Sequence, residues 1–576
     1  MVTIQGLGYN RNIVQIGEKA VLVVILSWVY IFIIAFAIGM AVDKWLFGTD
    51  NTSIARNCVT GLVTLTVYAE TFSIFYKVGL ICHLIMLIGA GLCIFLLRGQ
   101  LFSKLRDFFS QKRLIILAVI VLIGTFCTSR GTFHTDTGIY HAQAIRLLEE
   151  YGVLKGLGNL QLHFAYNSSY LPLCALFTLG FMLSSPLHTM TGFFMVLFCA
   201  HTVYGLYEFK KHERHGGDFS RIAILIYAMT NLSGLQSPAT DYGTMFMVLF
   251  ILSEWICYAE EKSGDENRDI RIYGYLSVLS IFTVSMKLSA AFLVVLAILP
   301  FIMLVKKKMW KELISYLLIG FLSFLPFLVR NVILSGWLFY PVASIDLFDV
   351  IWKIPAEYMK IDSDQIKVWG RCLFDVTRVD EPVSSWLPLW WEAKQHYEEM
   401  LIYSQAVGLM LLGVVTFFRI REKSFKPAVF VFYLTILVNI AVWFMTAPFI
   451  RYALAFLLLL PLCALGDALD LIFRKKNLIL IALSGLILIN FCSWVDNYFT
   501  DDMVFAKQNV TAGYYITPVP FDKGNMTAMD MNGVTVYHAD IDEINSYYVY
   551  PSTCYSGMAD RTELIGSTIE EGFKAK

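Results

Sequence analysis

The residues best suited to chemistry lie in one polar stretch, RGTFHTDTGIYHAQAIRLLEEYG, which begins at Arg130 and follows four apolar runs. Within twelve residues it gathers Arg130, His134, Asp136, Tyr140 and His141. Unpaired charge at or beside a bilayer is costly, so titratable side chains collected there indicate a functional site. This loop is therefore the first candidate for a catalytic or binding segment.

Asp136 admits two interpretations. An Asp just before a periodic run is a common helix N-cap, and the helix expected here covers Ile139–Tyr151. A carboxylate in the same place could act as a general base, accepting the proton of an acceptor hydroxyl while that oxygen attacks a sugar carbon. The two roles are compatible, because a cap residue has a fixed side-chain direction.

A metal site is the alternative for the same loop. His134, Asp136 and His141 could chelate a divalent cation if the three side chains converge, although His-x-Asp-x4-His matches no strong metal signature. A divalent cation is the one cofactor that these residues suggest, and none is certain.

The composition identifies the class of protein that must hold this loop. The chain has 576 residues, of which 57% are hydrophobic and 16% charged, and its mean hydropathy is +0.62. These values are typical of a polytopic membrane protein. The 45 basic and 45 acidic residues cancel, so bulk charge gives no case for nucleic-acid binding.

Apolar runs long enough to cross about 30 Å of hydrocarbon predict about 13–14 transmembrane helices. The runs begin at Ala20, Cys58, Gly79, Leu114, His188, Arg221, Gly243, Ile272, Ser289, Leu313, Leu401, Ala428, Tyr452 and Asn477. The run Leu171–Ser184 is too short for a full crossing and predicts a half-span or an interfacial helix. We therefore expect an all-α membrane fold.

Lys and Arg residues predict the orientation, because basic residues in short loops resist translocation. The intervals 98–113, 208–221, 306–311, 419–426 and 474–476 hold 20 of them in 47 positions. The long polar regions 130–170, 334–400 and 496–576 hold 14 in 189 positions. The long loops and the C-terminus are therefore expected on the extracytoplasmic side.

This topology divides the chain into six segments. They are N-terminal transmembrane helices (1–129), a first exterior loop with an amphipathic helix (130–170), central transmembrane helices (171–333), a Trp-rich exterior loop (334–400), C-terminal transmembrane helices (401–495) and a small exterior domain (496–576). Alternating stretches such as GVTVYHADI predict an α+β tail of about 80 residues, near the lower size limit for independent folding.

Charged residues from distant segments should reach the same outer face. Lys287, Arg330 and Arg451 end or begin outward spans and could bind a phosphate of a lipid carrier together. A lone cation in such a place is more often an interfacial snorkelling residue. The supporting polar side chains expected around Asp136 and these cations are His134, His141, Asp241 and Asn331.

Six of the twelve tryptophans lie in 334–400. They are Trp337, Trp352, Trp369, Trp386, Trp390 and Trp391. Composition leaves two interpretations open, an aromatic belt at the membrane interface and a platform for sugar rings.

Several segments together resemble a known group. The loop with Asp136, the helix YHAQAIRLLEEYG, the segments GLGNLQLHFAYNSS and RNVILSGWLFYP, the Ala-Pro-x-x-Arg turn and the tail TCYSGMADRTELIGSTIEEGF resemble uncharacterised bacterial multi-spanning membrane proteins of the GT-C glycosyltransferase-like superfamily. That resemblance implies an inverting glycosyltransferase with a polyprenyl-phosphate-linked sugar donor. It implies Asp136 as the base and Lys287, Arg330 and Arg451 on the donor phosphate. The adjacent paired acids of many such loops are absent, because Thr135 and Thr137 flank Asp136.

The expected function is transfer of a sugar to a cell-envelope glycan or lipid acceptor at the outer face of the bacterial inner membrane. The expected partners are the lipid-linked donor, membrane lipid and the acceptor. Two alternatives stay open, a transporter or flippase of a lipid-linked saccharide and a glycan polymerase or ligase.

Overall fold

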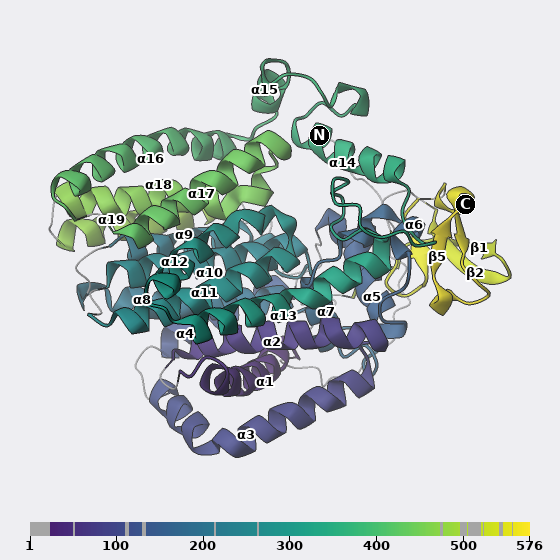
Figure 1. Cartoon of the computed structure of the whole chain (residues 1–576), viewed down its shortest axis with the longest axis horizontal. Coiled ribbons are helices and arrows are strands. Elements are labelled where there is room, and N and C mark those ends of the chain that lie inside the picture. Colours follow the sequence, from purple (N-terminus) through teal and green to yellow (C-terminus); the bar gives the residue numbers. More distant parts are fainter. Residues whose placement is uncertain are drawn as a thin grey trace.

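Long helices that run side by side form most of the described chain (Figure 1). The computed structural model describes residues 23–49, 52–109, 114–129, 134–211, 215–261, 264–424, 426–472, 476–495, 504, 520–521, 523–540, 545–555 and 557–576. Arg130 lies outside these residues.

The helices of the bundle coincide with the apolar runs of the sequence. They are α1 (Val23–Trp45), α2 (Ile54–Phe75), α3 (Leu80–Phe109), α4 (Leu114–Thr128), α8 (Met190–Tyr207), α9 (Gly216–Thr230), α10 (Thr240–Glu260), α11 (Glu266–Met286), η5 (Leu288–Ala297) continuing into α12 (Ile298–Lys306), α13 (Trp310–Ser335), α16 (His396–Arg421), α17 (Pro427–Thr446), α18 (Ile450–Ile472) and α19 (Lys476–Trp494). Each of the fourteen predicted runs is helical.

Ten helices of the described chain are long and apolar enough to cross a membrane. They are α1, α2, α3, α8, α10, η5 with α12, α13, α16, α17 and α18. Helices α4 and α19 are apolar but shorter, α9 has 15 residues, and α11 begins with the charged sequence ENRDIR. The chain is thus a multi-pass, mostly helical protein, and any span beyond these ten stays a prediction.

Small residues set how closely the first two helices pack. A Cβ on Gly39 of α1 would lie 1.7 Å from the Asn57 carbonyl oxygen, and one on Gly61 of α2 would lie 1.8 Å from the Ala35 carbonyl oxygen. The two backbones therefore touch, as is usual where small residues line the contact between membrane helices.

The segment 171–184 forms only a short helix, as predicted. Helix α7 (Tyr170–Phe177) has eight residues and every one of them is buried. It packs against α2 and α5 inside the molecule. Other helices therefore cover α7, and its half-span or interfacial placement in a membrane stays a prediction.

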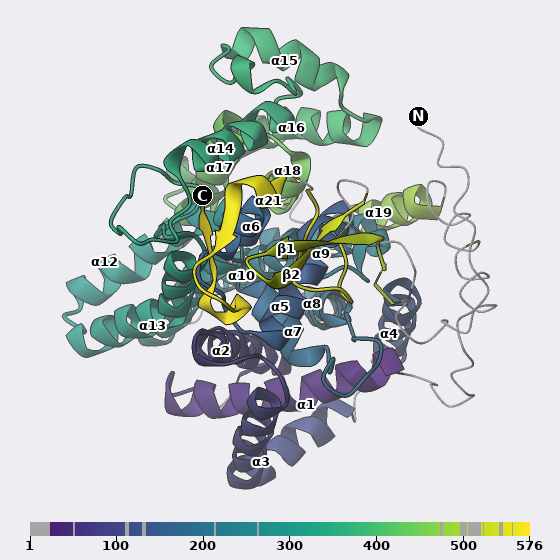
Figure 2. The same ribbon diagram turned by 90° about the vertical axis from the view of Figure 1, so that its right-hand side faces the viewer.

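The elements of the three polar regions 130–170, 334–400 and 496–576 gather at one end of the bundle (Figure 1; Figure 2 views this end). They are α5 (Ala142–Glu150), α6 (Leu157–Leu160), α14 (Ala356–Gly370), α15 (Val383–Glu392), β1 (Met526–Met531), β2 (Val534–Ala539), β3 (Ser552–Thr553), α21 (Met558–Arg561), β4 (Thr562–Leu564) and β5 (Phe573–Ala575). The strands form a sheet of order β1-β2-β3 and a two-stranded sheet β4-β5. The predicted stretch GVTVYHADI contains β2.

The C-terminal segment shares its core with the first exterior loop. Val536, Leu564 and Phe573 pack with Leu147 and Phe164 in one buried cluster. The Phe573 amide donates to the Lys155 carbonyl oxygen at 2.9 Å, and the Asn545 amide donates to the Gly138 carbonyl oxygen at 2.9 Å. In the part of the tail that the structure describes, these side chains belong to a core that is shared with the loop. Parts of 496–544 lie outside the described residues.

Candidate active site

Four distant elements bring five charged or titratable side chains together. The charged cluster consists of His134, Asp136, Asp241, Lys287 and Arg451. His134 and Asp136 precede α5, Asp241 lies in the first turn of α10, Lys287 separates α11 from η5, and Arg451 lies in the first turn of α18.

The local structure explains these positions. Asp241 sits at a helix N-terminus, where the helix dipole favours a negative charge. The backbone of Lys287 is extended, with φ −163° and ψ 133°, so the chain breaks between α11 and η5 and frees this side chain from both helix surfaces. Asp241 and Lys287 therefore face each other across the junction.

Ion pairs join the cluster. The Arg451 Nη2 atom lies 3.2 Å from Asp136 Oδ2, and its Nε atom lies 3.8 Å from Asp241 Oδ2. The Lys287 ammonium donates to Asp241 Oδ1. Two carboxylates thus alternate with two cations, so the cluster has a balanced charge when His134 is neutral.

His134 is held as a neutral imidazole. Arg451 Nη1 lies 2.8 Å from His134 Nε2, and since a guanidinium only donates, Nε2 accepts. The Asp136 backbone N–H points to the other ring nitrogen, Nδ1, at 3.2 Å, so each ring nitrogen faces a donor and the site disfavours a second ring proton. Burial lowers the pKa of His134, in agreement with the neutral form, although Asp136 opposes that shift.

Aromatic rings form part of the wall. The Lys287 ammonium lies 4.2 Å from the centre of the Tyr452 ring, and the His134 and Tyr242 ring centres are 5.9 Å apart. Sequence reasoning missed both tyrosines. Their only signal was adjacency, since Tyr242 follows Asp241 and Tyr452 follows Arg451.

The cluster is partly open to solvent. The side chains of Asp136, Lys287 and Arg451 are 20%, 20% and 39% exposed, whereas Asp241 is 4% exposed. Asp136 and the two cations can therefore meet a ligand directly, and Asp241 lies behind them as their buried counter-charge.

Asp136 does not cap a helix with its side chain. The chain enters a π-helical turn at Thr137–His141 before α5, and the Asp136 carboxylate makes no capping hydrogen bond. The Thr137 and Ser237 hydroxyls are hydrogen-bonded and tie this turn to the loop before α10. The carboxylate points to Arg451 instead, so the N-cap interpretation was wrong.

His141 lies beside the cluster rather than in it. Its side chain is 1% exposed, neither ring nitrogen has a hydrogen-bond partner among the described residues, and its ring centre is 4.2 Å from that of Tyr140. Burial, and then the positive charge of neighbouring groups, lowers the pKa of His141 well below its ordinary value. His141 is therefore a neutral imidazole with two uncommitted nitrogens.

Arg330 and Asn331 belong to a separate, buried network. Arg330 Nε donates to Asn167 Oδ1 at 3.0 Å, and Arg330 Nη1 donates to Ser73 Oγ. Asn167 Nδ2 donates to Asn331 Oδ1 at 2.8 Å, and Asn331 Nδ2 donates to the Leu338 carbonyl oxygen at 2.9 Å. Among the described residues Arg330 makes no hydrogen bond or ion pair with the charged cluster, so the structure does not group it with Lys287 and Arg451.

The structure also changes the set of residues that could hold a metal ion. His134, Asp136 and Asp241, not His141, bring ligand atoms within 4.8 Å of one another. The Arg451 guanidinium contacts all three, through Nη1, Nη2 and Nε. In this arrangement the residues do not fit a divalent cation, because the guanidinium already neutralises them and fills the space between them.

A second carboxylate accompanies Asp136 after all. The sequence lacks paired acids in the first loop, and Asp241 supplies the partner from α10, with Arg451 between the two. Two carboxylates, one of them buried, and two cations thus share one partly open place at the end of the bundle.

The comparisons with known proteins concern the helical part of the chain. A family model described as a domain of unknown function (DUF8201) matches residues 21–458, which include the whole charged cluster and leave the C-terminal segment outside. Neither the curated proteins nor the solved structures contain a match to the chain. The chain belongs to the DUF8201 family.

Proposed function

We propose that the chain is an integral membrane glycosyltransferase of GT-C type that inverts the anomeric carbon. It transfers a sugar from a polyprenyl-phosphate-linked donor to a cell-envelope glycan or lipid acceptor at the outer face of the bacterial inner membrane. The observation that carries the proposal is the meeting of Asp136, Asp241, Lys287 and Arg451 from four remote elements.

The chemistry assigns each side chain a role. Asp136 accepts the proton of the acceptor hydroxyl, and the acceptor oxygen forms a bond to the anomeric carbon from the face opposite the phosphate. The bond between that carbon and the phosphate oxygen breaks, and its electron pair stays on the phosphate. Arg451 and Lys287 stabilise the charge that develops there, Arg451 as a fork and Lys287 as a point charge.

The ion pairs suggest how a donor would activate the site. Arg451 holds Asp136 at 3.2 Å, so a phosphate that binds the guanidinium competes with this carboxylate. Displaced from Arg451, Asp136 becomes a free acceptor for a proton. Asp241 stays behind with Lys287, because it is buried and the ammonium donates to it directly.

The sidedness is also part of the proposal. It rests on the excess of Lys and Arg in short loops at the end of the bundle opposite the cluster. Spans beyond the ten apolar helices, formed by α4, α9, α11 and α19, would complete the predicted set of about 14.

The direct test measures release of the lipid phosphate, which does not depend on knowing the acceptor. The purified full-length chain is incubated with a panel of polyprenyl-phosphate-linked hexoses and a membrane extract, and polyprenyl phosphate is followed by mass spectrometry. We expect release from at least one donor, with an inverted linkage in the product. A chain that binds these donors and cleaves none of them would refute a transferase.

One observation favours a transporter of a lipid-linked saccharide instead. Glu70 of α2 is completely buried, and neither carboxylate oxygen has a hydrogen-bond partner among the described residues. Buried charge within a span is common along transport pathways. Movement of a fluorescent lipid-linked sugar across vesicles, with its phosphate bond intact, would favour this alternative, and a polymerase or ligase would use the transferase site with a glycan acceptor.

A further inference from the structure

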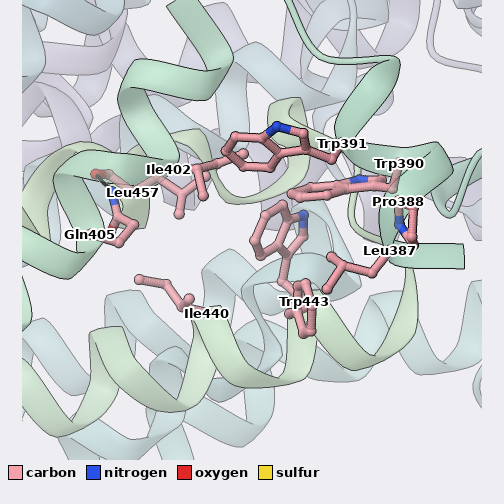
Figure 3. A pocket seen from close by; sticks show the side chains of 10 residues that line it. Leu387, Pro388, Trp390, Trp391, Ile402, Gln405, Ile440, Trp443 and Leu457 are labelled. Carbon is pink, nitrogen blue, oxygen red and sulfur yellow. Dashed lines mark hydrogen bonds between the residues drawn. The ribbon is translucent and has the colours of Figure 1, made fainter. Parts of the chain in front are cut away.

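The helices α16, α17 and α18 form a forked groove beneath an exterior helix. Helices α16 and α17 both pack on α18, but among the described residues they make few direct contacts with each other. The cavity between them measures about 530 Å³, and α15 covers its exterior end (Figure 3). This volume is typical of a small-molecule binding site.

Tryptophans line the cavity with ring faces rather than with polar atoms. The Trp390 indole N–H donates to the Pro448 carbonyl oxygen at 2.9 Å, and the Trp443 indole N–H donates to the Phe449 carbonyl oxygen at 2.7 Å. Both donors are thus committed to the backbone. A sugar ring on this platform would find few polar partners, so the cavity suits an apolar occupant better than the saccharide that the tryptophans of this loop had suggested.

Gln405 is the one polar side chain that lines the cavity. Its amide nitrogen donates to the Leu401 carbonyl oxygen at 2.8 Å and the Leu457 carbonyl oxygen at 2.7 Å, and so fastens α16 to α18. Its Oε1 atom is buried without a hydrogen-bond partner among the described residues. A single acceptor is too little to hold a polyhydroxylated ligand, because each buried hydroxyl needs a partner of its own.

The groove faces the region where lipid would lie. Leu409 of α16, which lies two turns beyond Ile402 on the same helix face, is 49% accessible. In a helix apolar enough to cross a membrane, such a surface contacts lipid chains. An apolar chain can therefore enter between α16 and α17 from the side, without passing through water.

Two tryptophans of the cavity wall are hydrogen-bonded to the turn that precedes Arg451. Pro448 and Phe449, which receive the two indole hydrogen bonds, immediately precede the first turn of α18. The Arg451 guanidinium carbon lies 5.6 Å from the centre of the Phe449 ring. One short turn therefore connects the wall of the cavity with Arg451 of the charged cluster.

We propose that this cavity binds the apolar chain of the same lipid phosphate whose head group binds Arg451 and Lys287. The head-group assignment rests on the proposed function, whereas the chain site rests on the cavity itself. An occupant that packs against Trp390 and Trp443 also stabilises the 448–449 turn, and through it the direction of Arg451. Chain binding and phosphate binding should thus reinforce each other.

The test compares a lipid phosphate with a phosphate that has no chain. Binding of geranylgeranyl phosphate and of ethyl phosphate to the purified full-length chain is measured by native mass spectrometry. We expect geranylgeranyl phosphate to bind at least tenfold more tightly. Ile402→Trp and Ile440→Trp, which fill the cavity from α16 and from α17, should each weaken geranylgeranyl phosphate at least tenfold and change ethyl phosphate by less than twofold.

A matched variant controls for the added indole. Val407→Trp places it on the face of the same helix that points away from Ile402 and Gln405, at a side chain that is 52% exposed, and should leave both affinities unchanged. Thermal unfolding identifies a variant that is merely destabilised. Because the two cavity variants lie on different helices, one folded variant suffices for the comparison. A diazirine on the geranylgeranyl chain should label α16 or α17 in the unchanged protein, which needs no variant at all.

The outcomes separate this inference from the proposed function. Unchanged geranylgeranyl phosphate binding in a folded cavity variant, or labelling confined to other helices, overturns the chain site even where donor cleavage persists. If the variants bind geranylgeranyl phosphate more weakly but the unchanged protein cleaves no donor, the result supports the chain site and refutes the proposed transferase activity. Equal competition by dioleoyl phosphatidic acid would make the cavity a general acyl site and overturn its assignment to the single-chain lipid phosphate.

Discussion

Replacement of Asp136 by Asn should separate phosphate binding from catalysis. With His134 neutral, the cluster has two negative and two positive side chains, so Asp136→Asn gives it a net positive charge. The change also frees Arg451 from a carboxylate 3.2 Å away. A lipid phosphate should therefore bind the variant at least as tightly as it binds the unchanged protein.

The magnitudes follow from the exposure of the pair. Arg451 is 39% exposed and Asp136 is 20% exposed, so solvent screens their attraction and the pair contributes up to about 1 kcal/mol. Removing this competition tightens phosphate binding by up to about fivefold. Loss of a general base, by contrast, slows transfer by about 10²- to 10⁴-fold. The two effects have opposite sign and very different size.

The assay measures both quantities on one preparation. Geranylgeranyl phosphate binding gives the affinity, and release of polyprenyl phosphate from the cleaved donor gives the rate. Asp349→Asn, at an exposed aspartate of the exterior loop, is the matched control and should change neither. Transfer at the normal rate by Asp136→Asn would refute the base, and a weaker affinity would refute the competition for Arg451.

The remaining predictions concern the surroundings of the site. Arg330→Met should lower the free energy of unfolding by roughly 3 kcal/mol, because it removes a buried charge together with its hydrogen bonds. The folded variant should bind the phosphate with unchanged affinity. A loss of phosphate affinity at unchanged stability would show that Arg330 belongs to the phosphate site. Chelators should not alter binding of geranylgeranyl phosphate, since Arg451 fills the space between the three ligand atoms; restoration of lost binding by Mn²⁺ would contradict this. The Tyr547 hydroxyl of the tail donates to Glu149 Oε2 at 2.5 Å. Burial raises the pKa of Glu149 to about 7 from 4.5, so its contribution to tail docking is full below pH 4.5 and is lost as the pH rises through 7. Protease protection of the tail should fall over that range, and Glu149→Gln should flatten the curve, whereas an unchanged curve would exclude Glu149 as its cause.

The sequence alone determined the helical architecture and the place of the site along the chain. Hydrophobic run length predicted every helix of the bundle, because only a continuous apolar stretch can cover a span. Alternation predicted β2 in the tail. Asp136, Asp241, Lys287 and Arg451 all lie near the ends of apolar segments, which predicted that they reach the same depth of the bundle. Charged residues of an apolar helix are found near its ends because the membrane interior excludes them.

Tertiary structure decided which of these residues meet. Arg330 and Arg451 look alike in sequence, each near the outer end of a span, but successive residues of a helix differ in direction by about 100°. Rotation of α13 turns Arg330 inward to Ser73 and Asn167, and α18 presents Arg451 to the cluster. No periodicity within one helix reports on that choice, because the faces of its neighbours decide it.

Packing between elements also explains why Asp241, and not His141, joins Asp136 in the charged cluster. His141 lies five residues from Asp136 and Asp241 lies over a hundred residues away, yet Asp241 is the one that shares Arg451 with Asp136. The π-helical turn at Thr137–His141 carries His141 into the interior instead. The tail likewise docks on the first loop through hydrophobic side chains that belong to one core only after both have folded. Spacing along the chain limits which side chains can lie near one another, and the packing between helices determines which of them do.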